Sequence, residues 1–161
     1  MKYVDRPGTG VSIHVDASPE TVWEVVSDIN LSARFDTELQ RAEWLDDDPA
    51  VGARFAGFNA HPRIGEWQVV CRVDWYEPGR SFGWRVTGDD GSPGQWRFTL
   101  EPEDGGTRLR FDAQMGPGRS GLNPAIDAMP DREDDIVARR LGEWAQNMTK
   151  VVEGTKAIAE G

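Results

Sequence analysis

The sequence predicts one α+β domain in which a curved antiparallel sheet of seven strands is covered on one face by a long C-terminal helix. In residues 40–115, apolar and polar side chains alternate and turn sequences interrupt them about every ten residues, which is typical of an antiparallel meander. Residues 131–159 instead contain no proline and carry one apolar stripe at helical spacing, which indicates a single helix. Seven tryptophans are several times the average content for 161 residues, and five of them fall on the apolar side of the predicted strands.

One strand and two short helices are expected before the meander. Residues 10–16 alternate as a half-buried strand does. Ser18 and Pro19 follow as a helix start, because serine can accept a hydrogen bond from a free backbone amide and proline has no amide to leave unpaired. A second short helix is predicted over residues 31–39, and residues 1–8 are predicted to be a loosely ordered tail. The element order is therefore β-α-α-β6-α, in a single domain that spans residues 1–161.

Five turn sequences divide the meander into six strands: residues 46–49, 61–65, 77–79, 89–94 and 103–106. One side of each strand carries its apolar residues, so one face of the sheet is expected to be buried. Nine aromatic residues fall on that side: Trp44, Phe55, Trp67, Trp75, Phe82, Trp84, Trp96, Phe98 and Phe111. One helix contacts only a stripe of a wide, twisted sheet, so some of these side chains should line a cavity. The alternative is a solid core in which they pack against one another.

The C-terminal helix, predicted over residues 131–159, should be about 40 Å long at 1.5 Å per residue. Its apolar stripe has seven members: Val137, Leu141, Trp144, Met148, Val151, Thr155 and Ile158. Acidic residues gather at its start and lysines lie near its end, which is the order that the helix dipole favours. We expect the stripe to cover the sheet; the alternative is pairing with a second copy in a coiled-coil homodimer.

The candidate ligand-binding residues combine buried-side residues of the strands with stripe residues of the helix. They are Trp44, Phe55, Asn59, Trp67, Val69, Cys71, Phe82, Trp84, Trp96, Phe98, Phe111, Leu141, Trp144 and Met148. A largely apolar wall with a few polar groups such as Asn59 is typical of pockets for small molecules. A small apolar molecule is therefore the expected partner.

Composition excludes several other classes. The net charge of −10 argues against nucleic acid as a partner, since phosphate binding depends on clustered lysine and arginine. No segment approaches the roughly 18 consecutive apolar residues of a membrane span, and residues 1–10 lack the apolar core of a secretion signal, so a cytoplasmic protein without stable membrane insertion is expected. Cys71 is the only cysteine, which excludes an internal disulfide and a cysteine zinc cluster. We expect no metal and no cofactor.

Motifs that could carry chemistry are few. Residues 116–121 match G-x-G-x-x-G, but no βαβ unit follows and Pro117 removes an amide that a phosphate-binding loop would use. We interpret the segment as a flexible connector. His61 falls in a predicted turn at the rim of the sheet beside Asn59, and these two are the only candidates for catalysis, although a loop histidine without a catalytic role is the favoured interpretation. Cys71 lies in mid-strand among apolar residues, so its thiol is expected to be inert.

Four segments carry a resemblance to a known family: residues 11–23 (VSIHVDASPETVW), 51–55 (VGARF), 77–80 (EPGR) and 106–109 (GTRL). In this order they are similar to segments of the START and birch-pollen-allergen superfamily (SRPBCC), specifically its bacterial polyketide cyclase/dehydrase-like branch. The resemblance spans nearly the whole chain. It implies a helix-grip fold, in which the sheet wraps around the C-terminal helix, and a deep cavity for lipids, polyketides, steroids or other apolar molecules. The family has no universal catalytic motif, so the resemblance assigns no catalytic residue.

Three functions are compatible with these features. We favour a non-catalytic binder or carrier of a small hydrophobic ligand, such as a lipid, a polyketide or an aromatic metabolite, because few titratable groups fall on the buried side. The first alternative is an enzyme, either a polyketide cyclase or aromatase or a dehydratase. The second is a protein-interaction module that resembles the related Hsp90-activator domains and uses its acidic surface.

Overall fold

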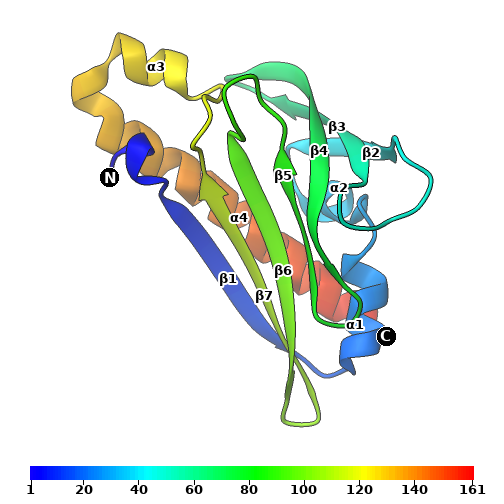
Figure 1. Cartoon of the computed structure of the whole chain (residues 1–161). Helices are drawn as coiled ribbons and strands as arrows, with labels where there is room; N and C mark the ends of the chain where they lie inside the picture. Colours follow the sequence, from blue (N-terminus) through cyan, green and yellow to red (C-terminus); the bar gives the residue numbers. More distant parts are fainter.

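One antiparallel sheet with the strand order β1-β7-β6-β5-β4-β3-β2 forms the frame of the molecule. The computed structural model describes all 161 residues and confirms the predicted α+β helix-grip architecture (Figure 1). The strands are β1 (Gly8–Val15), β2 (Leu39–Trp44), β3 (Arg54–His61), β4 (Gly65–Glu77), β5 (Ser81–Val86), β6 (Gly94–Glu103) and β7 (Gly106–Met115). The helical elements are η1 (Tyr3–Asp5), α1 (Pro19–Val26), α2 (Leu31–Phe35), α3 (Asn123–Ala128), η2 (Pro130–Arg132) and α4 (Glu133–Ala159).

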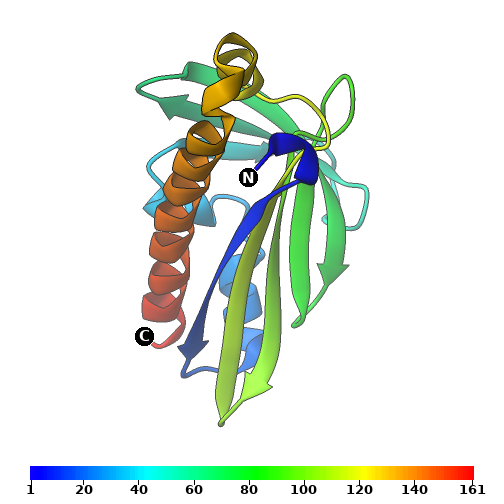
Figure 2. The ribbon, with the colours of Figure 1, turned by 90° about the vertical axis from the view of Figure 1, so that its left-hand side faces the viewer.

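Helix α4 runs along the concave side of the sheet and contacts β1, α1 and α2 (Figure 2). Most of the predicted stripe is buried there, since Val137, Met148, Val151 and Thr155 are at most 3% exposed. Ile158, at the C-terminal end, is 36% exposed, so the last member of the stripe is not buried. No helix in the chain combines the length and the apolar composition needed to cross a membrane.

The two short helices pack between α4 and the sheet, α1 against β6 and β7 and α2 against β2. Helix α1 begins as predicted, with the Ser18 hydroxyl oxygen accepting a hydrogen bond from the Thr21 amide at 3.2 Å. Helix α2 is shorter than the predicted 31–39, because a carboxylate oxygen of Asp36 accepts a hydrogen bond from the Glu38 amide at 2.6 Å. This local turn takes the chain out of the helix and into β2.

Residues 1–8 differ from the predicted loose tail. They form η1 and the start of β1, and Tyr3 is only 7% exposed. The Tyr3 hydroxyl donates a hydrogen bond to the Gly118 carbonyl at 2.6 Å, and the Tyr3 amide donates one to the Glu133 carboxylate at 2.7 Å. A buried aromatic anchor therefore fixes this segment against the connection between β7 and α4.

Trp75 lies on the opposite face of the sheet from the one that alternation predicts. The pairing of β4 with β5 shifts by one residue between Val73 and Trp75, as at a β-bulge. Past this shift the side chains change faces. The guanidinium groups of Arg85 and Arg97 lie 5.1 and 5.0 Å from the centre of the Trp75 ring, while Tyr76 packs against the core in its place.

Candidate ligand-binding cavity

A cavity of about 770 Å³ lies between the sheet and helices α2 and α4. This is within the range of pockets that hold small molecules. Its apolar wall comes from the inward side of β3 to β7, from Trp144 and Met148 on α4, and from Ile29 in the turn between α1 and α2. The loop between β5 and β6 and the connection from β7 to α3 complete the wall at one end, with lining residues 87–89, 93 and 119–122. The alternation of residues does not predict this part of the wall, because parity within strands carries no information about loops.

Aromatic side chains form the floor and one side of the cavity. The Trp84 ring lies at the centre, with ring centroids of Phe55 and Phe111 at 5.8 and 6.4 Å. Trp96 on β6 and Trp144 on α4 meet from opposite layers, with centroids 4.8 Å apart and planes tilted by 53°. These rings pack in the tilted and edge-on arrangements that aromatic pairs prefer, and the space beside them stays open.

Ten of the predicted ligand-binding residues lie on the wall: Phe55, Asn59, Trp67, Val69, Cys71, Trp84, Trp96, Phe111, Trp144 and Met148. Four others lie behind it. Phe82 and Phe98 are 1% exposed and belong to the core, and Trp44 packs edge-on against Phe55 at 5.6 Å. Leu141 packs in a second apolar cluster with Val137 and others. Alternation along a strand predicts the face of a side chain but not its depth, which explains the three strand residues, and helical spacing has the same limit for Leu141.

A buried ion pair that the sequence did not reveal forms the polar wall. Both terminal nitrogens of Arg140 on α4 donate to the two carboxylate oxygens of Glu38, at 2.7 and 2.8 Å. The Arg140 and Glu38 side chains are only 12% and 11% exposed, and both residues line the cavity. Two parallel hydrogen bonds of this kind give a strong and directional pair. The pair fixes the start of β2 to α4, and nothing in the sequence near either residue indicates the other.

Arg140 also bridges to a second carboxylate, one helical turn along α4. Its guanidinium donates to Glu143 at 2.9 Å, and Asn147 donates to Glu38 at 3.4 Å. Partial burial opposes ionisation of Glu143, but hydrogen bonds from Arg140 and His61 outweigh it and hold the pKa of that carboxyl below its ordinary value. The polar wall is thus a network of charged hydrogen bonds rather than one pair.

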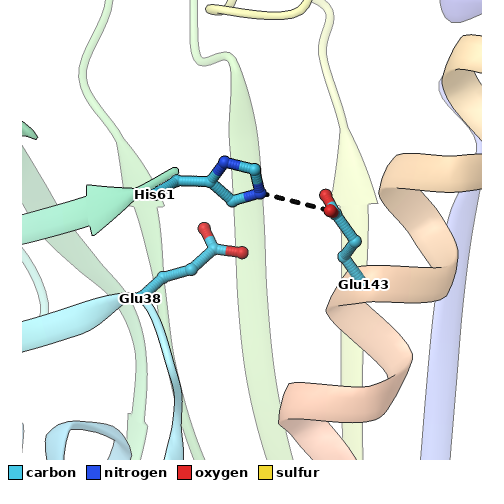
Figure 3. Close-up of side chains that lie close together, drawn as sticks. All are labelled: Glu38, His61 and Glu143. Atoms are coloured by element: carbon cyan, nitrogen blue, oxygen red, sulfur yellow. Dashed lines mark hydrogen bonds and ion pairs between the residues drawn. The ribbon is translucent and has the colours of Figure 1, made fainter. Parts of the chain in front are cut away.

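His61, at the end of β3, joins this network from the sheet side (Figure 3). Its Nε2 lies 3.1 Å from a Glu143 oxygen, and its Nδ1 accepts a hydrogen bond from the Arg63 amide at 3.0 Å. Because Nδ1 is the acceptor, Nε2 carries the proton of the neutral ring and donates to Glu143. Both nitrogens are therefore engaged within the protein, and His61 is not among the residues that line the cavity.

Glu38, His61 and Glu143 have potential ligand atoms within 4.8 Å of one another, the kind of cluster that can hold a metal ion (Figure 3). The donors present here do not fit that role. Arg140 already binds both oxygens of Glu38 and one oxygen of Glu143, and His61 directs a proton rather than a lone pair toward Glu143. A guanidinium thus occupies the position between the carboxylates that a cation would need.

Two other candidate groups, Asn59 and Cys71, lie on the wall outside this network. Asn59 lies on the wall, in β3. Cys71 is 2% exposed, and burial raises the pKa of its thiol to about 12. At neutral pH such a thiol stays protonated, so Cys71 is a packing residue rather than a nucleophile.

Comparison with known proteins agrees with this fold. The sequence profile of the family described as polyketide cyclase / dehydrase and lipid transport matches residues 9–156. The solved structure of the polyketide-cyclase-like protein Cgl2372 from Corynebacterium glutamicum is 30% identical; the alignment covers 94% of this chain and 88% of that one, with a TM-score of 0.61. No curated protein sequence matches the chain significantly.

Two more distant structures show the same fold. The Zhui aromatase/cyclase from Streptomyces sp. R1128 is 16% identical over 96% of this chain and 93% of its own, with a TM-score of 0.70. The protein TTHA0849 from Thermus thermophilus is 12% identical over 95% of this chain and 97% of its own, with a TM-score of 0.67. Because the matching profile extends from β1 to the last turn of α4, the chain belongs to the polyketide cyclase / dehydrase and lipid transport family.

Proposed function

We propose that the protein binds a small, largely apolar ligand in the cavity between the sheet and α4. The observation that carries the proposal is the open volume of about 770 Å³ beside Trp67, Trp84, Trp96 and Trp144. A solid core would bring these rings to interior packing density and leave no such space. Apolar walls of this size bury most of the surface of a ligand with two to four fused rings, which is the main source of affinity in such pockets.

A saturable signal from a neutral aromatic probe tests this proposal. N-phenyl-1-naphthylamine emits strongly in apolar surroundings, and we expect one binding site per chain together with quenching of tryptophan emission. Met148→Arg should abolish the signal, because Met148 is 3% exposed on the cavity wall and the new charge would be buried without a partner. Gln146→Arg is the matched control, since Gln146 is exposed on the far side of α4 and should leave binding unchanged.

Val69→Trp provides a second test that adds no charge. Val69 lies on the cavity wall, and a larger ring there would occupy space that the probe needs. We expect weaker binding with a cooperative melt retained. A wild-type protein that melts cooperatively but gives no saturable response to the probe would show that the aromatic side chains form a solid core, and the proposed function would be lost.

A cyclase or dehydratase is the second candidate, and one wall residue favours it. Asp36 lines the cavity, and burial raises the pKa of its carboxyl, to which the nearby Glu38 charge also contributes. A carboxyl with a raised pKa is better suited to exchange a proton with a bound substrate.

Turnover of a poly-β-ketone substrate separates the two candidates. If the protein is an enzyme, Asp36→Asn should lower kcat by about 10²–10⁴-fold, as loss of a general acid or base does. His61→Ala should leave kcat within about twofold, because both ring nitrogens are already engaged and His61 does not line the cavity. A large loss of turnover in His61→Ala with an unchanged melting curve would contradict the role assigned to His61 here.

A further inference from the structure

The polar wall of the cavity has more carboxylates than positive charges. Asp36 and Glu38 line the cavity, and Glu143 stands behind Arg140. Arg140 is the one guanidinium among them, and even a protonated His61 would leave three carboxyl groups facing two positive charges. Burial and the Glu38 charge both raise the pKa of Asp36, which is the expected response of a carboxyl in a wall short of positive charge.

The end of the cavity formed by the β5–β6 loop and the connection from β7 to α3 does not supply the missing positive charge. Two charged residues line it, the negative Asp89 and the positive Arg119. The Arg119 guanidinium, however, is paired with Asp127 outside the cavity, and the Arg119 amide donates to Asp90 at 3.0 Å. Asp89 is in no ion pair of its own, so this end also presents negative charge to the cavity.

A ligand carboxylate would gain little from the one guanidinium of the polar wall. Three of the five N–H donors of Arg140 already bind Glu38 and Glu143. A ligand carboxylate at the two remaining donors, on Nε and Nη2, would therefore lie beside a positive charge that two carboxylates already neutralise. Displacing Glu38 instead would leave it, at 11% exposure, as a buried charge without a partner, which is strongly unfavourable.

The aromatic side of the cavity favours positive charge as well. The faces of Trp67, Trp84, Trp96 and Trp144 carry the negative part of the ring quadrupole, which attracts cations within about 6 Å of the ring centre. Arg140, at 6.0 Å from the Trp144 ring, is the one cation of the protein that contacts any of these four rings. No cation of the protein lies over the faces of the other three rings in this way.

We propose that the cavity selects ligands by charge and takes a protonated aromatic or alicyclic amine in preference to a carboxylic acid of the same skeleton. This rests on the proposed function and narrows it to one chemical class. The amine would lie against the ring faces with its charge toward Glu38 and Asp36. Fatty acids and other carboxylates would be poor ligands of this member of the fold.

Three matched probes test the selection. Naphthalene with an aminomethyl, a hydroxymethyl or a carboxylate group at position 1 keeps the skeleton and changes only the charge. By calorimetry at pH 7 we expect the amine to bind tightest, the alcohol next and the acid weakest, with about tenfold or more between amine and acid. Binding of the acid as tight as that of the amine overturns the selection. Absence of binding by all three overturns the proposed function as well, whereas the alcohol binding as tightly as the amine overturns the selection alone.

A pair of substitutions separates the effect of the polar wall on ligand selection from the effect of the overall charge of −10. Glu38→Gln and Glu66→Gln each remove one negative charge, but Glu66 is exposed on β4 and does not line the cavity. Glu38→Gln should lower the amine-to-acid affinity ratio by about tenfold, and Glu66→Gln should change it less than twofold. Equal effects of the two variants would assign the selection to net charge and overturn the role of the wall. If Glu38→Gln does not fold, Asp36→Asn gives the same comparison with Glu66→Gln.

Discussion

A chain that ends at Arg140 should fail to fold. It lacks five side chains of α4 that are at most 7% exposed: Leu141, Met148, Val151, Val152 and Thr155. Losing one large buried side chain costs about 2–5 kcal/mol, and the net stability of a domain is only about 5–15 kcal/mol. The deletion would also expose the aromatic residues on the concave side of the sheet. We expect insoluble protein or a compact state without a cooperative melt, measured by near-UV circular dichroism and thermal denaturation.

A shorter deletion provides the control. A chain that ends at Ala157 loses only the last four residues, of which Ile158 is the largest and is 36% exposed. Its main polar loss is Glu160, which accepts a hydrogen bond from the Asp16 amide at 2.7 Å. We expect a sharp melt with the midpoint lowered by only a few degrees. If the chain that ends at Arg140 is soluble and melts as sharply as this one, α4 is not the element that holds the sheet.

The strands could be predicted because the sheet is covered on one face only. Burial on one side forces apolar and polar residues to alternate, so the sequence records both the strands and their inward side. Alternation does not predict the face of Trp75 correctly. The bulge in β4 inserts one residue, and alternation alone does not reveal which residue is skipped.

The cavity was less predictable than the sheet. The same alternation applies to Trp84, which lines the cavity, and to Phe98, which is buried in the core beneath it. Which of the two meets open space depends on the curvature of the sheet and on the path of α4. Those are properties of the assembled fold, and no local pattern of residues encodes them.

The polar wall was missed for a different reason. Glu38 and Arg140 are separated by 102 residues, and the local sequence around each is typical of an exposed polar surface. One signal was present: Arg140 and Glu143 are spaced as neighbours on a helix, and Arg140 is next to a stripe residue, Leu141. Such spacing indicates an ion pair but not its burial. The depth of Arg140 depends on Glu38 being brought to it by the turn at Asp36.

The family shares the fold, but the chemistry of each member depends on its own wall residues. At 12–16% identity, the distant structures have nearly the same frame with a largely different set of side chains. In this chain the wall combines four tryptophans with a network rich in carboxylates. The network therefore calls for separate tests of its energetic role and of its role in binding.

Arg140→Met should be among the most destabilising single substitutions in the protein. It leaves Glu38, 11% exposed, as a buried carboxylate without its ionic partner, and breaking a buried pair from one side costs about 3–5 kcal/mol. Arg139→Met is the matched control, since Arg139 is exposed and forms no ion pair, and it should change stability by at most about 0.5 kcal/mol. The double variant Glu38→Leu/Arg140→Met should recover most of the loss, because two apolar side chains replace both charges.

The pH dependence of the stability loss in Arg140→Met separates two causes: an unpaired charge on the buried Glu38 and the loss of packing by Arg140. In the Arg140→Met variant, protonation of Glu38 removes the buried charge, so the stability difference from the wild type should shrink as pH falls from 7 to about 4.5. Glu143 of the wild type adds little to this change. Its pKa is held below the ordinary value, so its contribution to stability is present above the unfolded pKa and is lost only at lower pH, as pH falls through the folded pKa. Denaturant titrations of the three variants at both pH values measure these differences. A loss of stability in Arg140→Met that is the same at both pH values, with no recovery in the double variant, would mean that Arg140 stabilises the fold by packing on Trp144 rather than by neutralising Glu38.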